Sequence, residues 1–248
     1  MEAQPKCNLI IDSCCDLPFE VIDRPGVQLL EFPYIDEKGE HSDDLYRSVT
    51  PHEFYEGMRA GSQPSTAQVP VTVFHDVFSK AIESGVPTVY LSFTSGLSGS
   101  FNTAVMMRDQ LIAEHPEAEL YVVDTYLASV AEALLVYEAL NQRDNGMTAR
   151  ELAAWAEEAR YFVDAEFMVD DLESLRRGGR IPSTVAYAGA KLDVKPLLNI
   201  SIEGKLALTG VARGRKKGIR QLAEYCSKRI TDQMPGRCVV IGNADCPK

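Results

Sequence analysis

The chain has 248 residues, of which 45% are hydrophobic and 25% charged, so it can bury a core that needs no cross-links. This composition is that of a globular protein, and it excludes disordered, collagen-like and membrane-spanning chains. The 25 basic and 36 acidic residues give a formal net charge of −11. That charge argues against a general affinity for nucleic acid or for anionic lipid surfaces.

The first half of the chain alternates strand and helix patterns, as βα units do. Strands are expected at residues 8–11, 27–34, 88–93 and 120–123. Helices are expected at residues 17–23, 50–61, 70–84, about 101–115, 129–143 and from 148 onward. Strand, polar turn and helix recur, which predicts a parallel sheet covered by helices, with ligands bound at the carboxyl ends of its strands.

The pattern changes near residue 161. Strands are expected at 162–169, 196–202, 205–211 and 237–242, and helices at 172–177 and 214–230. Glu203-Gly204 between two of these strands is a hairpin signal. We therefore predict an N-terminal α/β domain over residues 1–160 and a C-terminal α+β domain over residues 161–248.

The most informative segment is the turn at residues 94–100, Thr-Ser-Gly-Leu-Ser-Gly-Ser, between a strand and a helix. Thr94 and Ser95 bring two hydroxyls to a turn made flexible by Gly96, and the N–H groups at the helix start point to the same place. Such a helix end binds carboxylate or phosphate. The alternative is that the serines only cap the helix. The turn lacks the Gly-x-Ser-x-Gly of a nucleophile elbow and the Gly-Lys-Ser/Thr of a Walker loop.

A second hydroxyl-rich turn lies at residues 64–70, where Thr66 precedes a predicted helix. Taken alone, this turn is best interpreted as a helix cap formed by Thr66. Two basic stretches, 176–180 and 213–217, stand out in an acidic chain. Arg213, between a strand and a helix, is the best placed of these residues to offer a cation to a bound anion, and the others are expected to face solvent or a partner.

Candidates for acid–base catalysis are few. The four histidines, His41, His52, His75 and His115, lie outside the hydroxyl turns, and no His, Asp or Glu spacing indicates a metal site. Hydroxyls that have no nearby base bind more readily than they react. We therefore expect a binding protein with no catalytic residue, no metal and no cofactor.

The cysteines do not form the two Cys-x-x-Cys pairs of a structural zinc site. They are Cys7, Cys14, Cys15, Cys226, Cys238 and Cys246. Free thiols are typical of a reducing compartment, and the first ten residues lack the pattern of a signal peptide. We expect a cytoplasmic monomer with at most transient membrane contact.

The chain resembles the DegV family of bacterial fatty-acid-binding proteins over essentially its whole length. The motifs that carry the resemblance keep the family's order and spacing. They are 11–13 with 16–18, 64–69, 94–100, 123–125, 172–181, 195–198, and Arg213 with Lys216-Lys217.

The resemblance implies two α/β domains with a long acyl tunnel between them. It implies that Thr66 and Ser95 hold the carboxylate of a long-chain fatty acid, which Arg213 joins in some members. It further implies that a separate fatty-acid kinase subunit phosphorylates the bound fatty acid to an acyl phosphate. The basic stretches would then form the surface on which the kinase docks.

The chain departs from the family pattern in two places. Ala67 stands where the family usually has a serine, and similar proteins continue for a few dozen residues beyond Lys248. The sequence is therefore expected to be a fragment or to have a trimmed second domain.

Two other functions stay open on the sequence. One is a phosphoryl- or acyl-transfer enzyme that uses the Ser95 turn as an anion site. The other is a regulatory module that binds a partner through its basic helix at residues 214–230.

Overall fold

A computed structural model describes residues 5–181, 193–230 and 238–246. These residues form two compact units, which are described separately. The first unit is Met1–Val163 together with Val240–Lys248, and the second is Asp164–Val239.

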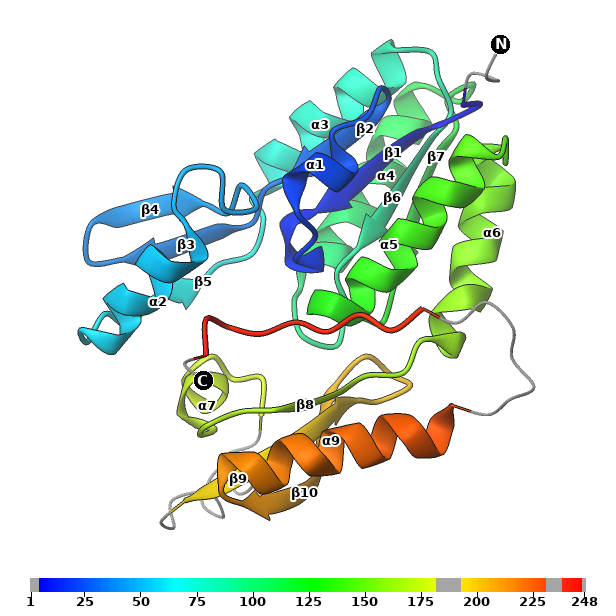
Figure 1. Cartoon of the computed structure of the whole chain (residues 1–248). Coiled ribbons are helices and arrows are strands. Elements are labelled where there is room, and N and C mark those ends of the chain that lie inside the picture. The colour runs from blue at the N-terminus through cyan, green and yellow to red at the C-terminus, as the bar shows by residue number, and fades with distance from the viewer. Residues whose placement is uncertain (1–4, 182–192, 231–237, 247–248) are drawn as a thin grey trace. The chain divides into compact units, whose positions relative to one another are not determined.

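A four-stranded parallel sheet forms the centre of the described part of the first unit (Figure 1). Its strands, in spatial order, are β2 (Val27–Leu30), β1 (Asn8–Asp12), β6 (Thr88–Ser92) and β7 (Leu120–Asp124). Leu9 pairs with Val27 on one side and with Val89 on the other. The predicted parallel sheet is confirmed, and consecutive strands end at one common edge.

Helices cover both faces of this sheet because its strands are apolar on both sides. Ile10 and Tyr90 face α3 (Val71–Glu83) and α4 (Ser100–Glu114). Leu9, Ile11 and Val89 face the opposite core. The helices on that side are α1 (Phe19–Ile22), α5 (Ser129–Asp144) and α6 (Ala149–Ala159). The predicted helices agree with these elements to within a few residues.

The strand predicted at residues 27–34 is wrong as a single element. After β2 the backbone of Phe32 bonds elsewhere: its N–H donates to Ser13 Oγ (3.1 Å) and its carbonyl accepts from Asp43 N (2.8 Å). A second, antiparallel sheet follows in the order β4 (Gly39–Ser42), β3 (Pro33–Asp36), β5 (Ser65–Thr66). The helix α2 (Pro51–Arg59) begins with a capping box between Thr50 and Glu53.

The second unit has a helical element beside an antiparallel hairpin sheet, as predicted (Figure 1). Its described strands, in spatial order, are β10 (Leu206–Arg213), β9 (Val194–Ile200) and β8 (Glu166–Met168). Its helices in the described chain are α7 (Glu173–Arg177) and α9 (Arg215–Arg229). The core contains Leu172, Ile181 and Leu198. The predicted strand at 162–169 is shorter than expected, because Arg160–Phe162 form a 3₁₀ turn.

The strand predicted at residues 237–242 is also wrong within its described part. Cys238–Gly242 pair with no strand, and the side chain of Ile241 is 88% exposed. Arg237 lies outside the described residues. Val240–Lys248 belong to the first unit, whereas the sequence places them in a C-terminal domain. Contacts with α2 account for this assignment. Asp245 accepts hydrogen bonds from Arg59 (2.8 Å) and pairs with His52 (2.9 Å), and both residues lie on α2.

None of the described helices is long and apolar enough to cross a membrane. All six cysteines are free thiols.

Candidate functional site

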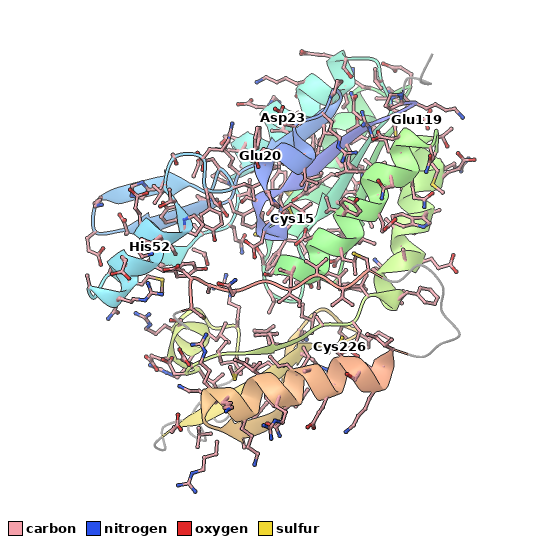
Figure 2. The ribbon with its side chains drawn as sticks, in the orientation of Figure 1. Cys15, Glu20, Asp23, His52, Glu119 and Cys226 are labelled. Atoms are coloured by element: carbon pink, nitrogen blue, oxygen red, sulfur yellow. The ribbon has the colours of Figure 1, made fainter. Side chains whose placement is uncertain are left out.

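The carboxyl ends of the parallel strands bring polar side chains together at one edge of the sheet. Asp12 ends β1, Thr94 and Ser95 follow β6, and Asp124 ends β7. Figure 2 shows Cys15 beside this edge and Glu119, which precedes β7, at the opposite edge. This is the edge at which parallel α/β sheets bind ligands.

Hydrogen bonds within the chain hold the Ser95 turn in place. The N–H of Ser95 donates to Asp124 Oδ1 (3.1 Å), and the N–H of Gly96 donates to Thr94 Oγ1 (3.0 Å). Thr94 is fully buried. The N–H groups of Ser95 and Gly96 are therefore already used within the chain. Thr94 and Gly96 shape the turn, and their direct contact with a ligand stays a prediction.

The capping interpretation holds for part of the turn. Ser98 Oγ accepts from the N–H of Ser100 (3.2 Å) at the start of α4. Ser100 Oγ accepts from the N–H of Val69 (3.2 Å), which joins the loop after β5 to this turn. The Gln68 side chain lies so close to Gly99 that a Cβ at Gly99 would clash with the Gln68 amide. The two hydroxyl-rich turns predicted from the sequence are thus packed against each other.

Thr66 does not cap a helix, contrary to the expectation from its turn alone. It lies in β5, paired with Tyr34, and α3 begins only at Val71, preceded by Pro70 and without a side-chain cap. Thr66 is exposed and Ser95 is half-buried. The structure gives neither hydroxyl a hydrogen-bond partner among residues 5–181, 193–230 and 238–246. Both are therefore available to a ligand.

Sequence reasoning did not predict the burial of the acids behind the turn. Asp12 Oδ2 accepts from Phe93 N (2.7 Å) and from the Tyr90 hydroxyl (3.0 Å), and Oδ1 accepts from Cys14 N (3.1 Å). Burial raises the pKa of Asp12 to about 7, against the effect of these hydrogen bonds.

Glu132, on the first turn of α5, is the second buried acid. It is fully buried, and neither carboxyl oxygen has a hydrogen-bond partner in the described chain. Burial, together with the nearby Asp12, raises the pKa of Glu132 well above its usual range. The signal was present in the sequence, because a lone acid stands in the apolar run 130–136.

Arg213 ends β10 in the second unit and is exposed. It borders a surface hollow of about 620 Å³ at the start of α9. The hollow is lined by Arg213, Gly214, Lys216, Lys217, Arg220, Gln221 and Glu224. The contact of Arg213 with a ligand head group stays a prediction.

The histidines pair with acidic residues that lie outside the two hydroxyl-rich turns. His41 pairs with Asp36, His75 with Asp76 and His115 with Glu117. His52, Glu56 and Asp245 form the one group of potential metal ligands found in the described part of the chain. Arg59 already pairs with both of its carboxylates (2.6 and 2.8 Å) and competes with any cation there.

The fold and the free hydroxyls define the chain as an α/β protein with a polar site at the carboxyl edge of a parallel sheet. A family model described as "Uncharacterised protein, DegV family" matches residues 6–247. The chain belongs to the DegV family. A "DegV domain-containing protein" of Clostridium perfringens is 34% identical over 241 residues, which cover 97% of this chain and 82% of that protein.

Solved structures of the family share the fold. A DegV family protein from Thermus thermophilus, described by its fatty-acid binding, is 28% identical with a TM-score of 0.75, covering 90% of this chain and 77% of that one. A stearic acid-binding protein from Eubacterium ventriosum is 26% identical with a TM-score of 0.80, covering 90% and 76%. The Fatty Acid Kinase B3 protein of Streptococcus pneumoniae, loaded with linoleic acid, is 21% identical with a TM-score of 0.77, covering 90% and 78%.

Proposed function

We propose that this protein binds a long-chain fatty acid through the hydroxyls of Thr66 and Ser95 and presents it to a separate fatty-acid kinase subunit. The observation that carries the proposal is that the hydroxyls of Thr66 and Ser95 have no partner in the described chain and lie on two segments joined by the Val69–Ser100 hydrogen bond (3.2 Å). The fatty acids held by the Thermus thermophilus and Eubacterium ventriosum relatives support it.

Head group and acyl chain have different parts in this binding. Each methylene removed from water contributes about 0.8 kcal/mol, so the acyl chain supplies most of the affinity. Two hydroxyl donors are enough to orient a carboxylate, and they leave part of it open to a phosphoryl donor. The acyl tunnel between two domains stays a prediction from the resemblance, as does a role for Arg213 at the head group.

A carrier fits the site better than an enzyme of phosphoryl or acyl transfer. A hydroxyl nucleophile needs a base within hydrogen-bond reach. In the described chain the histidines pair with acids elsewhere, and Asp124, the carboxylate nearest the turn, accepts from the N–H of Ser95 and of Tyr126 (3.1 Å each). The Ser95 hydroxyl is thus placed to bind rather than to react.

The test is fatty-acid retention in a pair of hydroxyl variants. Thr66→Val and Ser95→Ala remove the hydroxyls with little change of shape, and Thr72→Val, on an exposed turn of α3, is the matched control. Purified proteins are loaded with oleate, washed and extracted for mass spectrometry. We expect the control to retain the lipid and the double variant to lose at least tenfold in affinity, since each lost charge-assisted hydrogen bond is worth about 1.5–3 kcal/mol. Equal retention in all three proteins would refute this head-group site.

A further inference from the structure

The edge of the sheet that carries Ser95 is strongly acidic, which is unusual for a site that accepts an anion. Asp124 Oδ1 lies 3.1 Å from the amide nitrogen of Ser95. Asp12 lies behind the same turn, with Oδ2 2.7 Å from Phe93 N. Glu132 is buried beside them with both oxygens unpartnered in the described chain. A ligand carboxylate at the Ser95 hydroxyl would add one more negative charge to this group.

Among the described residues, the strongest interactions of the two buried acids include no basic partner. Besides burial, the groups acting on Glu132 are Asp12, Asp16 and Asp124, all acidic. The titratable and charged groups around the pair, element by element, are Asp12 on β1, Cys14, Cys15 and Asp16 after it, Tyr90 on β6, Asp124 on β7, Glu132 on α5 and Asp43 beside Asp16. Arg160 approaches from the end of α6, where it donates to the main-chain carbonyl of Asp124 (2.5 Å) and stacks on Tyr126.

We propose that a carboxylate binds at the Ser95 turn together with one proton, which the Asp12–Glu132 pair takes up from solvent. The inference rests on the proposed function and concerns the regulation of the same site. Asp12 acts as a positioning residue, because its carboxyl group holds the amide of Phe93 two residues before Ser95. Glu132 supplies the second carboxyl group of the pair.

The physical basis is linkage between two like charges in a low-dielectric site. An added anion disfavours the ionised forms of buried carboxyls nearby, so their proton affinity rises when the ligand binds. Asp12 titrates close to neutrality in the free protein, with a pKa of about 7 raised by burial. It is therefore partly ionised before binding and takes up a proton on binding. Affinity for an ionised ligand must then fall as pH rises.

The direct test measures protons taken up by the unmodified protein. Laurate is titrated into delipidated protein at pH 7.5 by calorimetry in phosphate and in Tris, whose ionisation enthalpies differ. We expect uptake of between half a proton and one proton per laurate bound. Equal heats in the two buffers would overturn the inference.

The pH dependence gives an independent measurement. Fatty-acid carboxyls have ordinary pKa values of about 4–5, so laurate is fully ionised from pH 7 upward. We expect its affinity to fall at least tenfold between pH 7 and pH 8.5, where linkage to one proton sets an upper limit of about thirtyfold. Dodecanol, which carries no charge, serves as the control ligand and should show a flat profile.

Variants of the two buried acids test whether the Asp12–Glu132 pair takes up the proton. Asp12→Asn mimics the protonated acid, so we expect a flattened profile and an affinity at pH 8.5 above that of the unmodified protein. A residue with a merely structural role would lower affinity at every pH instead. Glu132→Gln gives a second test, because it removes one of the two acids while keeping their shape. Asp23→Asn, which follows α1 at the opposite edge of the sheet, is the matched control and should behave like the unmodified protein (Figure 2).

The outcomes separate this inference from the proposed function. If neither laurate nor dodecanol binds at any pH, the fatty-acid proposal itself fails. If both ligands bind and laurate shows no proton uptake and a flat pH profile, only the proton-linked mechanism fails.

Discussion

At the scale of single residues, the buried acid Glu132, next to the candidate site, lowers the stability of the fold as pH rises. Transfer of an ionised carboxylate into a protein core without a partner costs several kcal/mol, so the group keeps its proton instead. Its pKa is accordingly raised well above the usual range, chiefly by burial. A group of this kind makes the fold less stable as pH rises, because the unfolded chain releases the proton and the folded chain retains it.

We therefore expect Glu132→Gln to stabilise the protein at alkaline pH. In the unmodified protein, stability above the unfolded pKa of about 4.3 falls by up to about 1.4 kcal/mol per pH unit until Glu132 ionises in the folded state. The amide removes this loss while keeping the side-chain shape. Urea unfolding at pH 5 and pH 8 measures the difference, with Glu119→Gln at the opposite edge as the control. A variant less stable than the unmodified protein at pH 8 would contradict the argument.

The hydroxyls of the site could be predicted from the sequence, and the hydrogen-bond partners of Asp12 and Asp124 behind them could not. The turn at 94–100 is so rich in serine and glycine that helix capping does not account for all of it, and Ser95 is left with a free hydroxyl in the described structure. Asp124 and Asp12 instead acquire their partners across the sheet, at Ser95 N and Phe93 N. Such contacts join residues 29 and 81 positions apart, and no local pattern encodes them.

At the scale of elements, the buried Arg143 joins the end of α5 to the amino ends of β1 and β2. Its Nε donates to the carbonyl of Cys7 (2.9 Å), a terminal nitrogen donates to the carbonyl of Pro25, and the other pairs with Asp144 (3.0 Å). Only 2% of the Arg143 surface is exposed. One guanidinium thus satisfies carbonyl groups of two separate chain segments at the edge of the sheet opposite the candidate site.

We expect Arg143→Met to destabilise the first unit by about 3 kcal/mol. The substitution keeps most of the apolar stem and removes the guanidinium donor of the buried Cys7 carbonyl and of the partly buried Pro25 carbonyl, where a buried carbonyl left without a donor costs about 1–3 kcal/mol. Denaturant unfolding of the variant measures the loss, with the exposed Arg150→Met on α6 as the control. A loss below about 0.5 kcal/mol would show that water replaces the guanidinium there.

Elements with a strong local signal were predictable, and those set by pairing were not. The capping boxes at Thr50–Glu53 and Thr148–Glu151 are local, and both form. In the small sheet β4-β3-β5, β3 pairs with β5 about 30 residues away and with β4 in a short hairpin, and the strands carry no clear alternation of apolar residues. The expected strand at 237–242 shows the opposite error, because an apolar run of high strand propensity has no partner strand among the described residues.

At the scale of the whole molecule, charge divides between the two units. Residues 164–239 contain 14 basic and 9 acidic residues, a net charge of +5, whereas the rest of the chain contains 11 and 27, a net charge of −16. The second unit is therefore basic, although the whole chain has a net charge of −11. Its basic side chains gather at the start of α9, around the hollow that Arg213, Lys216, Lys217 and Arg220 line. If the kinase subunit docks there, its surface must be acidic, since charge complementarity steers association and fixes orientation.

This docking proposal predicts a salt-sensitive reaction that charge reversal weakens. Lys216→Glu combined with Lys217→Glu changes the hollow by four charge units on an exposed face of α9. We expect the double variant to retain oleate as the unmodified protein does, since neither lysine belongs to the hydroxyl site. Formation of acyl phosphate by an added fatty-acid kinase with ATP should slow at least tenfold at low ionic strength, because loss of steering acts mainly on the association rate.

The salt dependence distinguishes docking from an indirect effect on the fold. Screening shortens the reach of charges to about 8 Å at physiological ionic strength, so the advantage of the unmodified protein should shrink as salt is added. Lys80→Glu combined with Arg108→Glu, on helices of the acidic first unit, supplies the matched control of equal charge change. If both double variants slow the kinase reaction equally, the total charge governs the encounter. A loss confined to the α9 variant would place the docking surface on the basic unit.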